Sequence, residues 1–325
     1  MDHKNLRLVF MGTPEFAVAS LDALVKEGIN IVGVITAPDK PAGRGMQLQQ
    51  SAVKKYAVEK GLPVLQPEKL KAPEFLDELK ALSADLQVVV AFRMLPEVGW
   101  NMPPLGTINV HSSLLPQYRG AAPINWAIIN GERETGVTTF KLKHEIDTGD
   151  ILLQEKTSIG EAETAGELHD RLKELGAQLL VRTIKSLEEG TLKETPQSEV
   201  AKNAKHALKI FTETCEIDWQ RPVQEVHNLI RGLSPFPGAF TQLQGKTLKI
   251  YRSEIEAVIP DIAVGAVATD NKTYLKFACI DGYIHIKEMQ LEGKKRMGIE
   301  DFLRGYRAPL NLPGGETSPP HNGPA

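Results

Sequence analysis

Alternation between short apolar strands and amphipathic helices constrains the fold of this chain more than any other feature. Leu6 to Met11 is an apolar run of strand length that ends in a turn at Gly12. Phe16 to Lys26 follows with apolar residues at helical spacing, and Ile29 to Thr36 is a second apolar run. Strand, glycine turn, helix and strand make a βαβ unit. Such units predict a mostly parallel, doubly wound sheet, which binds ligands at the carboxyl ends of its strands.

The same alternation continues through the first half of the chain. Leu86 to Phe92 is almost purely apolar, which is typical of a strand covered on both faces. The periodicity predicts a long amphipathic helix over 164–189, ended by Gly190. It also predicts helices over 51–59 and 73–82, and strands over 62–65, 106–111, 137–142 and 151–156.

The pattern changes after Gly190. Residues 191–206 are polar, and beyond a helix at 223–232 the chain shows short β runs separated by turns, which suits a small barrel. The last residues are rich in proline and glycine and lack periodicity. We therefore predict four parts: a Rossmann-like, doubly wound, mostly parallel sheet domain (1–190), a linker (191–206), a C-terminal β-rich, OB-like barrel (207–310) and a disordered tail (311–325).

The composition is that of an ordinary globular protein. Hydrophobic residues make up 42% of the chain and the net charge is −3, so no global field indicates nucleic acid or a membrane surface. No stretch approaches the roughly 18 apolar residues of a membrane span, and the first residues lack a secretory signal. The two cysteines form no C-x-x-C pair, which argues against a zinc or redox motif. We expect a metal-free, cytoplasmic protein.

Three polar residues supply the chemistry for acyl-type transfer. Asn109 and His111 lie two positions apart at the end of a predicted strand, and Asp147 lies in a glycine-containing turn, D-T-G-D. An asparagine N–H stabilises an oxyanion, a histidine carries a proton near neutral pH, and a neighbouring aspartate orients that histidine. The alternative is a satisfied polar pair at a strand end. The neighbouring S-S-L-L-P and R-G strings favour the functional interpretation.

Two segments carry local positive charge. The loop from Pro38 to Gly45 has two prolines and two glycines, and it would present Arg44 to an anionic partner. Lys294, Lys295 and Arg296 form the most basic cluster of the C-terminal part, which suits contact with a phosphate backbone. The alternative for both segments is a solvated surface loop.

The residues described above resemble the methionyl-tRNA formyltransferase family over positions 5 to 310. The most specific strings are FMGTPEFA, PDKPAGRG, NVHSSLLPQYRGAAPINWAI and DTGD, with GLSPFPGAF and GKKRM later in the chain. The resemblance implies transfer of a formyl group from 10-formyltetrahydrofolate to the amino group of methionyl initiator tRNA. It implies that Asn109, His111 and Asp147 are catalytic. It also implies that the first domain (1–190) binds the formyl donor and carries out catalysis, and that the C-terminal barrel (207–310) binds tRNA.

The resemblance also implies the binding residues. The segment from Val88 to Pro96 becomes part of the folate-pterin pocket. The expected folate contacts are Phe92, Arg93, Met94, Leu95, Ser113, Leu114, Leu115 and Pro116. The expected tRNA contacts are Arg44, Lys294, Lys295 and Arg296. The chain departs from many relatives in two places, at the pterin segment VAFRMLP and at Met46-Gln47, where some relatives carry lysines.

Two other functions compete with this interpretation. A formyltransferase acting on an amino sugar nucleotide would use the same three residues without tRNA. A nucleic-acid-binding module with an inactive Rossmann domain would not need them. We expect a monomer, with initiator methionyl-tRNA and the folate co-substrate as its partners and no contact with membranes.

Overall fold

The computed structural model describes residues 6–42, 46–199, 203–308 and 310. The chain divides into two compact units. The first comprises residues 1–124, 134–159 and 167–209, and the second comprises 125–133, 160–166 and 210–325. Two short segments that precede residue 167 in the sequence therefore belong to the second unit. The predicted domain boundaries stay a prediction, and the predicted tail at 311–325 lies outside the described residues.

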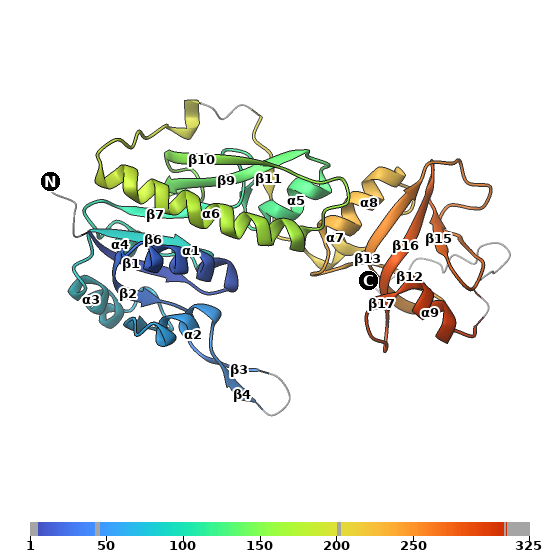
Figure 1. The fold of residues 1–325 in the computed structure, drawn as a ribbon, viewed down its shortest axis with the longest axis horizontal. Coiled ribbons are helices and arrows are strands. Elements are labelled where there is room, and N and C mark those ends of the chain that lie inside the picture. The colour runs from blue at the N-terminus through green and yellow to red at the C-terminus, as the bar shows by residue number, and fades with distance from the viewer. Residues whose placement is uncertain (1–5, 43–45, 200–202, 309, 311–325) are drawn as a thin grey trace, which may run out of the picture. The chain divides into compact units, whose positions relative to one another are not determined.

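The first unit is built on a seven-stranded sheet of order β10-β9-β7-β6-β1-β2-β5 (Figure 1). β1, β2, β5, β6 and β7 are parallel, while β9 and β10 are antiparallel additions at one edge. The strands are β1 (Arg7–Gly12), β2 (Asn30–Ile35), β5 (Val64–Leu65), β6 (Leu86–Val90), β7 (Thr107–His111), β9 (Glu134–Lys141) and β10 (Ile151–Ser158). The predicted mostly parallel sheet is confirmed.

Helices cover both faces of this sheet, as a doubly wound fold requires. On one face, α6 packs over β9 and β7, where the hydroxyl oxygens of Thr183 and Thr139 lie 2.8 Å apart (Figure 1). On the other face, Phe75 and Leu79 of α3 pack against Val9 of β1. The helices are α1 (Glu15–Lys26), α2 (Ala52–Glu59), α3 (Pro73–Ala81), α4 (Glu97–Trp100) and α6 (Ala165–Glu188).

Two small sheets complete the first unit. β3 (Lys40–Ala42) pairs antiparallel with β4 (Gln47–Gln49), so the predicted loop is a β-hairpin at its base. β8 (Arg119–Gly120) pairs in parallel with β11 (His206–Ala207), which comes from the stretch predicted to be a linker. A short 3₁₀-helix, η1 (Gln197–Glu199), lies in the same stretch. The connecting segment is therefore part of the first unit's structure.

The second unit is a six-stranded antiparallel half-barrel of order β12-β13-β16-β15-β14, with β17 paired to β16. Trp219 stacks on Phe277 with ring centroids 4.5 Å apart in its core. The elements are α5 (Pro123–Ile129), α7 (Thr212–Cys215), α8 (Val223–Gly232), β12 (Ala239–Leu243), β13 (Lys246–Glu256), β14 (Val267–Thr269), β15 (Leu275–Ala278), β16 (Tyr283–Leu291), β17 (Met297–Gly298) and α9 (Ile299–Gly305). The predicted β-rich C-terminal fold is confirmed.

Buried polar groups connect the helix α8 to the rest of the second unit. His227 is buried, and its Nδ1 lies 2.9 Å from the hydroxyl of Ser253 on β13. Burial, with a further contribution from the nearby Arg231 charge, lowers the pKa of His227. The Arg231 guanidinium donates to the carbonyl oxygens of Gly160 and Glu163.

In the described part of the chain, no helix is both long and apolar enough to cross a membrane.

Candidate active site

The carboxyl ends of β1, β6 and β7 meet at one edge of the first sheet. Gly12 of β1 pairs with Val90 of β6, and Val89 of β6 pairs with Asn109 of β7. The chain continues from β1 to β2 on one side and later from β6 to β7 on the other, so the strand order reverses here. In doubly wound sheets, ligands bind at such a reversal. Gly12 is required at this position, because a Cβ would lie 2.6 Å from the Cβ of Ala17 and 2.9 Å from the Val90 carbonyl oxygen.

His111 is buried at the end of β7 and faces an acceptor on each side. Its Nε2 lies 2.9 Å from the carbonyl oxygen of Tyr118, and its Nδ1 lies 3.9 Å from Oδ2 of Asp147. The carbonyl can only accept, so Nε2 must carry the proton of that hydrogen bond. Nδ1 then carries a proton only when the ring is an imidazolium. A charged His111 would direct its second N–H toward Asp147.

The turn that carries Asp147 is tightly defined. Asp147 has a left-handed backbone with φ of 56°, a conformation that aspartate and asparagine tolerate better than most residues. Its Oδ2 accepts a hydrogen bond of 2.9 Å from the backbone N–H of Gly120. A Cβ at Gly149 would lie 1.5 Å from the carbonyl oxygen of Lys141. The glycine of D-T-G-D therefore lets the turn pack directly on the end of β9.

Asn109 completes the group of three predicted catalytic residues. It lies on the same strand as His111 and two residues before it, so both side chains lie on one face of β7. Asn109 is half-buried, and its carboxamide makes no hydrogen bond to any other described residue. The structure thus brings His111 and Asp147 together and leaves the Asn109 amide available beside them.

Two side chains of the predicted folate segment after β6 are held in place, one by hydrogen bonds and one by burial in the core. Arg93 donates to the carbonyl oxygens of Pro67 and Glu68 at 2.7 and 3.0 Å, with its guanidinium 5.3 Å from the Phe92 ring centroid. Leu95 is buried in the core under β1 and β6. Met94, in contrast, is 73% exposed. Phe92 and Met94 therefore have the accessible apolar side chains of this segment.

The second predicted folate segment, from Ser113 to Pro116, is mostly buried. The Ser113 hydroxyl donates to the carbonyl oxygen of Gln117 at 2.6 Å, and Thr138 of β9 holds the backbone at both Ser113 and Leu115. Pro116 is buried as well, and Leu114 is half-buried. The side chains of this segment mainly position the loop, and their assignment to folate contact stays a prediction.

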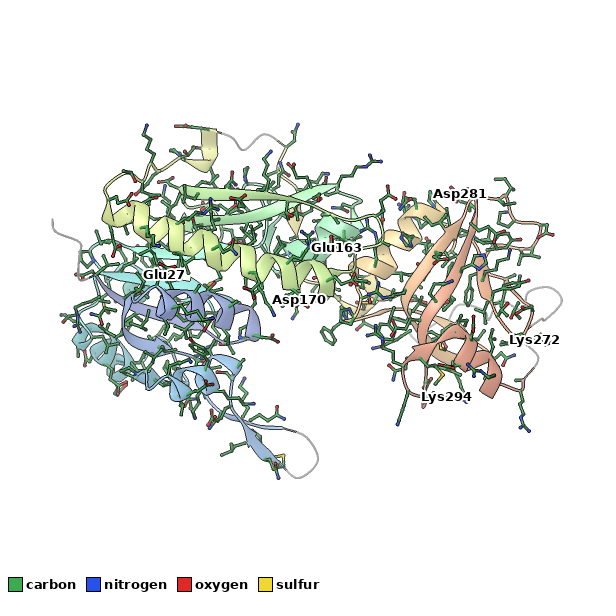
Figure 2. All side chains as sticks on the ribbon, viewed as in Figure 1. Glu27, Glu163, Asp170, Lys272, Asp281 and Lys294 are labelled. Carbon is green, nitrogen blue, oxygen red and sulfur yellow. The ribbon has the colours of Figure 1, made fainter. Side chains whose placement is uncertain are left out.

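The predicted tRNA-binding residues differ in their surroundings. Arg44 lies outside the described residues. Lys294 and Lys295 are exposed, and Figure 2 labels Lys294 at the surface of the second unit. Arg296 makes a two-point ion pair with Glu288 and lies over the Tyr251 ring, with Cζ 4.2 Å from the centroid. The charge of Arg296 is therefore balanced within its own unit.

Sequence reasoning missed Gln197, which is 2% exposed. Its Nε2 donates to the carbonyl oxygens of Asp147 and Gly149 at 2.7 and 2.8 Å, and its Oε1 accepts two hydrogen bonds from Arg119. The residue lies in the polar stretch predicted to be a linker. No local pattern marks a side chain whose partners are far away in the sequence.

The matched family models define the class of protein. A formyl transferase model matches residues 6–184, and a model of the formyl transferase C-terminal domain matches residues 209–307. A methionyl-tRNA formyltransferase of Parabacteroides distasonis is 56% identical over 94% of this chain and 98% of its own length. One of Bacteroides fragilis is 52% identical over 94% and 97%. The chain belongs to the methionyl-tRNA formyltransferase family.

A solved structure shares the fold at lower identity. An N-formyltransferase from Helicobacter canadensis, solved with folinic acid and dTDP-3-aminofucose, superposes with a TM-score of 0.64. It is 22% identical and covers 86% of this chain and 98% of its own. The resemblance recognised in the motifs and the two-part fold class are both confirmed.

Proposed function

We propose that this protein transfers the formyl group of 10-formyltetrahydrofolate to the amino group of methionyl initiator tRNA, giving formylmethionyl-tRNA for translation initiation. The observation that carries this proposal is the identity of 56% with a methionyl-tRNA formyltransferase across nearly the full length of both proteins. The sequence identity to the Helicobacter canadensis N-formyltransferase solved with dTDP-3-aminofucose is 22%. The amino sugar nucleotide is therefore the weaker candidate acceptor.

The proposed chemistry is an attack of the methionyl amine on the formyl carbon. A C–N bond forms to the amine, the carbonyl oxygen becomes an oxyanion, and the bond to the folate nitrogen then breaks. The Asn109 carboxamide, which has no partner among the described residues, donates to this oxygen. The imidazolium of His111 stabilises the same charge, and Asp147 orients that ring. The amine loses its proton, and the departing folate nitrogen gains one.

The folate binds, in this proposal, at the strand ends beside the group of three. Phe92 and Met94 supply accessible apolar surface, while Arg93 and Leu95 hold the segment in place. The segment Ser113–Pro116 contributes through its backbone and through Leu114. No metal ion is needed for this chemistry.

The tRNA contacts are proposed for two regions. Arg44, which lies between β3 and β4 in the sequence, contacts the acceptor end in this proposal. An ion pair of 2.5 Å between Asp39 and Lys54 holds the chain just before β3. Lys294 and Lys295 contact phosphates, and Arg296 supports them through its stacking on Tyr251. We also propose a cytoplasmic monomer in which residues 191–206, which belong to the first unit, connect the donor-binding part to the tRNA-binding part.

A single acceptor assay tests this function. The protein is incubated with labelled 10-formyltetrahydrofolate and either methionyl initiator tRNA or a dTDP-linked amino sugar. We expect label in the tRNA alone. Transfer to the sugar, or to neither acceptor while folate still binds, would refute the proposed reaction.

A further inference from the structure

The carboxamide of Gln197 belongs to a hydrogen-bond network around Asp147. Gln197 donates to the backbone carbonyl of Asp147 and accepts from the guanidinium of Arg119. Arg119 is covalently joined to Gly120, whose N–H donates to the Asp147 carboxylate. This network therefore holds both the backbone and the side chain of Asp147, a predicted catalytic residue.

The chemistry of the partners determines which end of the Gln197 amide faces which group. Carbonyl oxygens of Asp147 and Gly149 only accept, so they must face the NH₂ group. The Arg119 guanidinium only donates, so it must face the oxygen. All four hydrogen-bonding positions of the amide are used. No other neutral side chain of this length offers two donors and a strong acceptor in this arrangement.

Backbone hydrogen bonds hold the segment that carries Gln197 on both sides of this residue. Thr195 pairs with Ile151 at the start of β10, with reciprocal backbone hydrogen bonds of 2.8 and 2.9 Å. After Gln197, the Lys205 carbonyl accepts from the Tyr118 N–H at 2.6 Å, and Ala207 pairs with Gly120. Tyr118 also supplies the carbonyl that contacts His111. The segment therefore supports both the histidine and the aspartate.

We propose that Gln197 is a positioning residue for formyl transfer, acting through Asp147. It holds the D-T-G-D turn so that the carboxylate stays beside His111. This inference rests on the proposed catalytic role of Asp147. Gln197 is almost completely buried, so it contributes by geometry and makes no contact with either substrate.

The test compares Gln197→Glu and Gln197→Met with the wild type and with Gln178→Glu, a matched control exposed on α6. Glutamate keeps the acceptor for Arg119 but turns an oxygen toward two carbonyl oxygens. Methionine keeps the volume and removes both functions. We expect each Gln197 variant to lower kcat between about tenfold and a hundredfold, because small misplacements of catalytic groups have effects of this size. KM for folate and for tRNA should stay within about threefold, since Gln197 touches neither.

A double-variant comparison separates positioning from general loosening of the fold. In an Asp147→Asn background, Gln197→Met should cost less than about threefold more, because its effect passes through the missing carboxylate. Wild-type kcat in a folded Gln197→Met enzyme, a full multiplicative loss in the double variant, or a matching rise in KM would each overturn the proposal. If Gln197→Glu melts below the assay temperature, Gln197→Met supplies the same comparison. Normal turnover of Asp147→Asn itself would instead refute the proposed catalytic role, which keeps the two failures distinguishable.

Discussion

Replacing Asp147 by asparagine removes one charge from the candidate site and leaves its geometry in place. Asparagine tolerates the left-handed backbone at this position, where φ is 56°. Its amide oxygen accepts from the Gly120 N–H in place of the carboxylate. The loss of charge assistance in that bond costs about 1 kcal/mol of stability. The folded structure should therefore persist.

The distance between the two groups sets the size of the catalytic effect. Asp147 Oδ2 lies 3.9 Å from His111 Nδ1. At an effective dielectric constant of about 20, two unit charges at this separation attract by about 4 kcal/mol, which corresponds to about 10³-fold in rate if it is all expressed in the transition state. Loss of a general acid–base contribution sets the lower end at about 10²-fold. We expect kcat to fall within this range.

The assay is steady-state formylation of methionyl initiator tRNA at saturating 10-formyltetrahydrofolate, with a calorimetric melting curve for each variant. Asp150→Asn is the matched control, because Asp150 lies in the same turn and its carboxylate pairs with Lys143 at 2.7 Å instead of with His111. The control should keep wild-type turnover. An Asp147→Asn enzyme that turns over within about threefold of wild type, with an unchanged melting curve, would remove this carboxylate from the mechanism.

Four further predictions follow from single residues. Arg44→Ala should weaken formylation of tRNA strongly and flatten its salt dependence by about one phosphate contact, while folate affinity measured by calorimetry stays unchanged. Gly149→Ala places a Cβ 1.5 Å from a backbone carbonyl oxygen. It should lower the free energy of unfolding by about 1–3 kcal/mol and lower turnover, whereas Gly305→Ala, where no atom lies within reach, should do neither. Cys279 is fully buried and burial raises the pKa of its thiol to about 12, so it should react with a disulfide reagent at pH 8 only after unfolding. Because burial lowers the pKa of His227, the unfolded chain takes up that proton first, and the second unit should lose stability as pH falls below the ordinary value of 6.5. The slope is at most about 1.4 kcal/mol per pH unit, and denaturant titrations of His227→Gln should lack it.

Elements with a strong repeating pattern could be predicted from the sequence. The fully buried, almost purely apolar strand β6 and the long amphipathic helix α6 can be recognised locally, since a near-continuous apolar run and a 3.6-residue period need no knowledge of distant partners. The strands β12 and β13 lie where short β runs are predicted beyond the helix at 223–232. Asn109, His111 and Asp147 could be named because each carries the chemistry that the reaction needs. Their roles stay a prediction.

Elements whose structure depends on distant partners could not be predicted. The β3–β4 hairpin contains a proline and mostly polar residues, so it lacks the alternation of a strand pair. Helix α5 has seven residues and too few turns to show a period. Gln197 is buried because of hydrogen bonds to residues 50 and 78 positions earlier, and polar composition alone suggested a linker. In each case tertiary contacts decide the local structure.

The long separation between Gln197 and its partners affects the order in which a growing chain can complete the site. All seven strands of the first sheet end by Ser158, so that sheet can pair before residues 195–207 have been synthesised. The turn at Asp147 and the loop at Gln117 accept hydrogen bonds from residues that lie 50 and 88 positions further along the chain. Contacts this far apart form late, because loop closure must precede them. A nascent chain that stops at Gly190 therefore already contains every proposed catalytic residue. The turn that carries Asp147 lacks its hydrogen bonds from Gln197 until the connecting segment is synthesised.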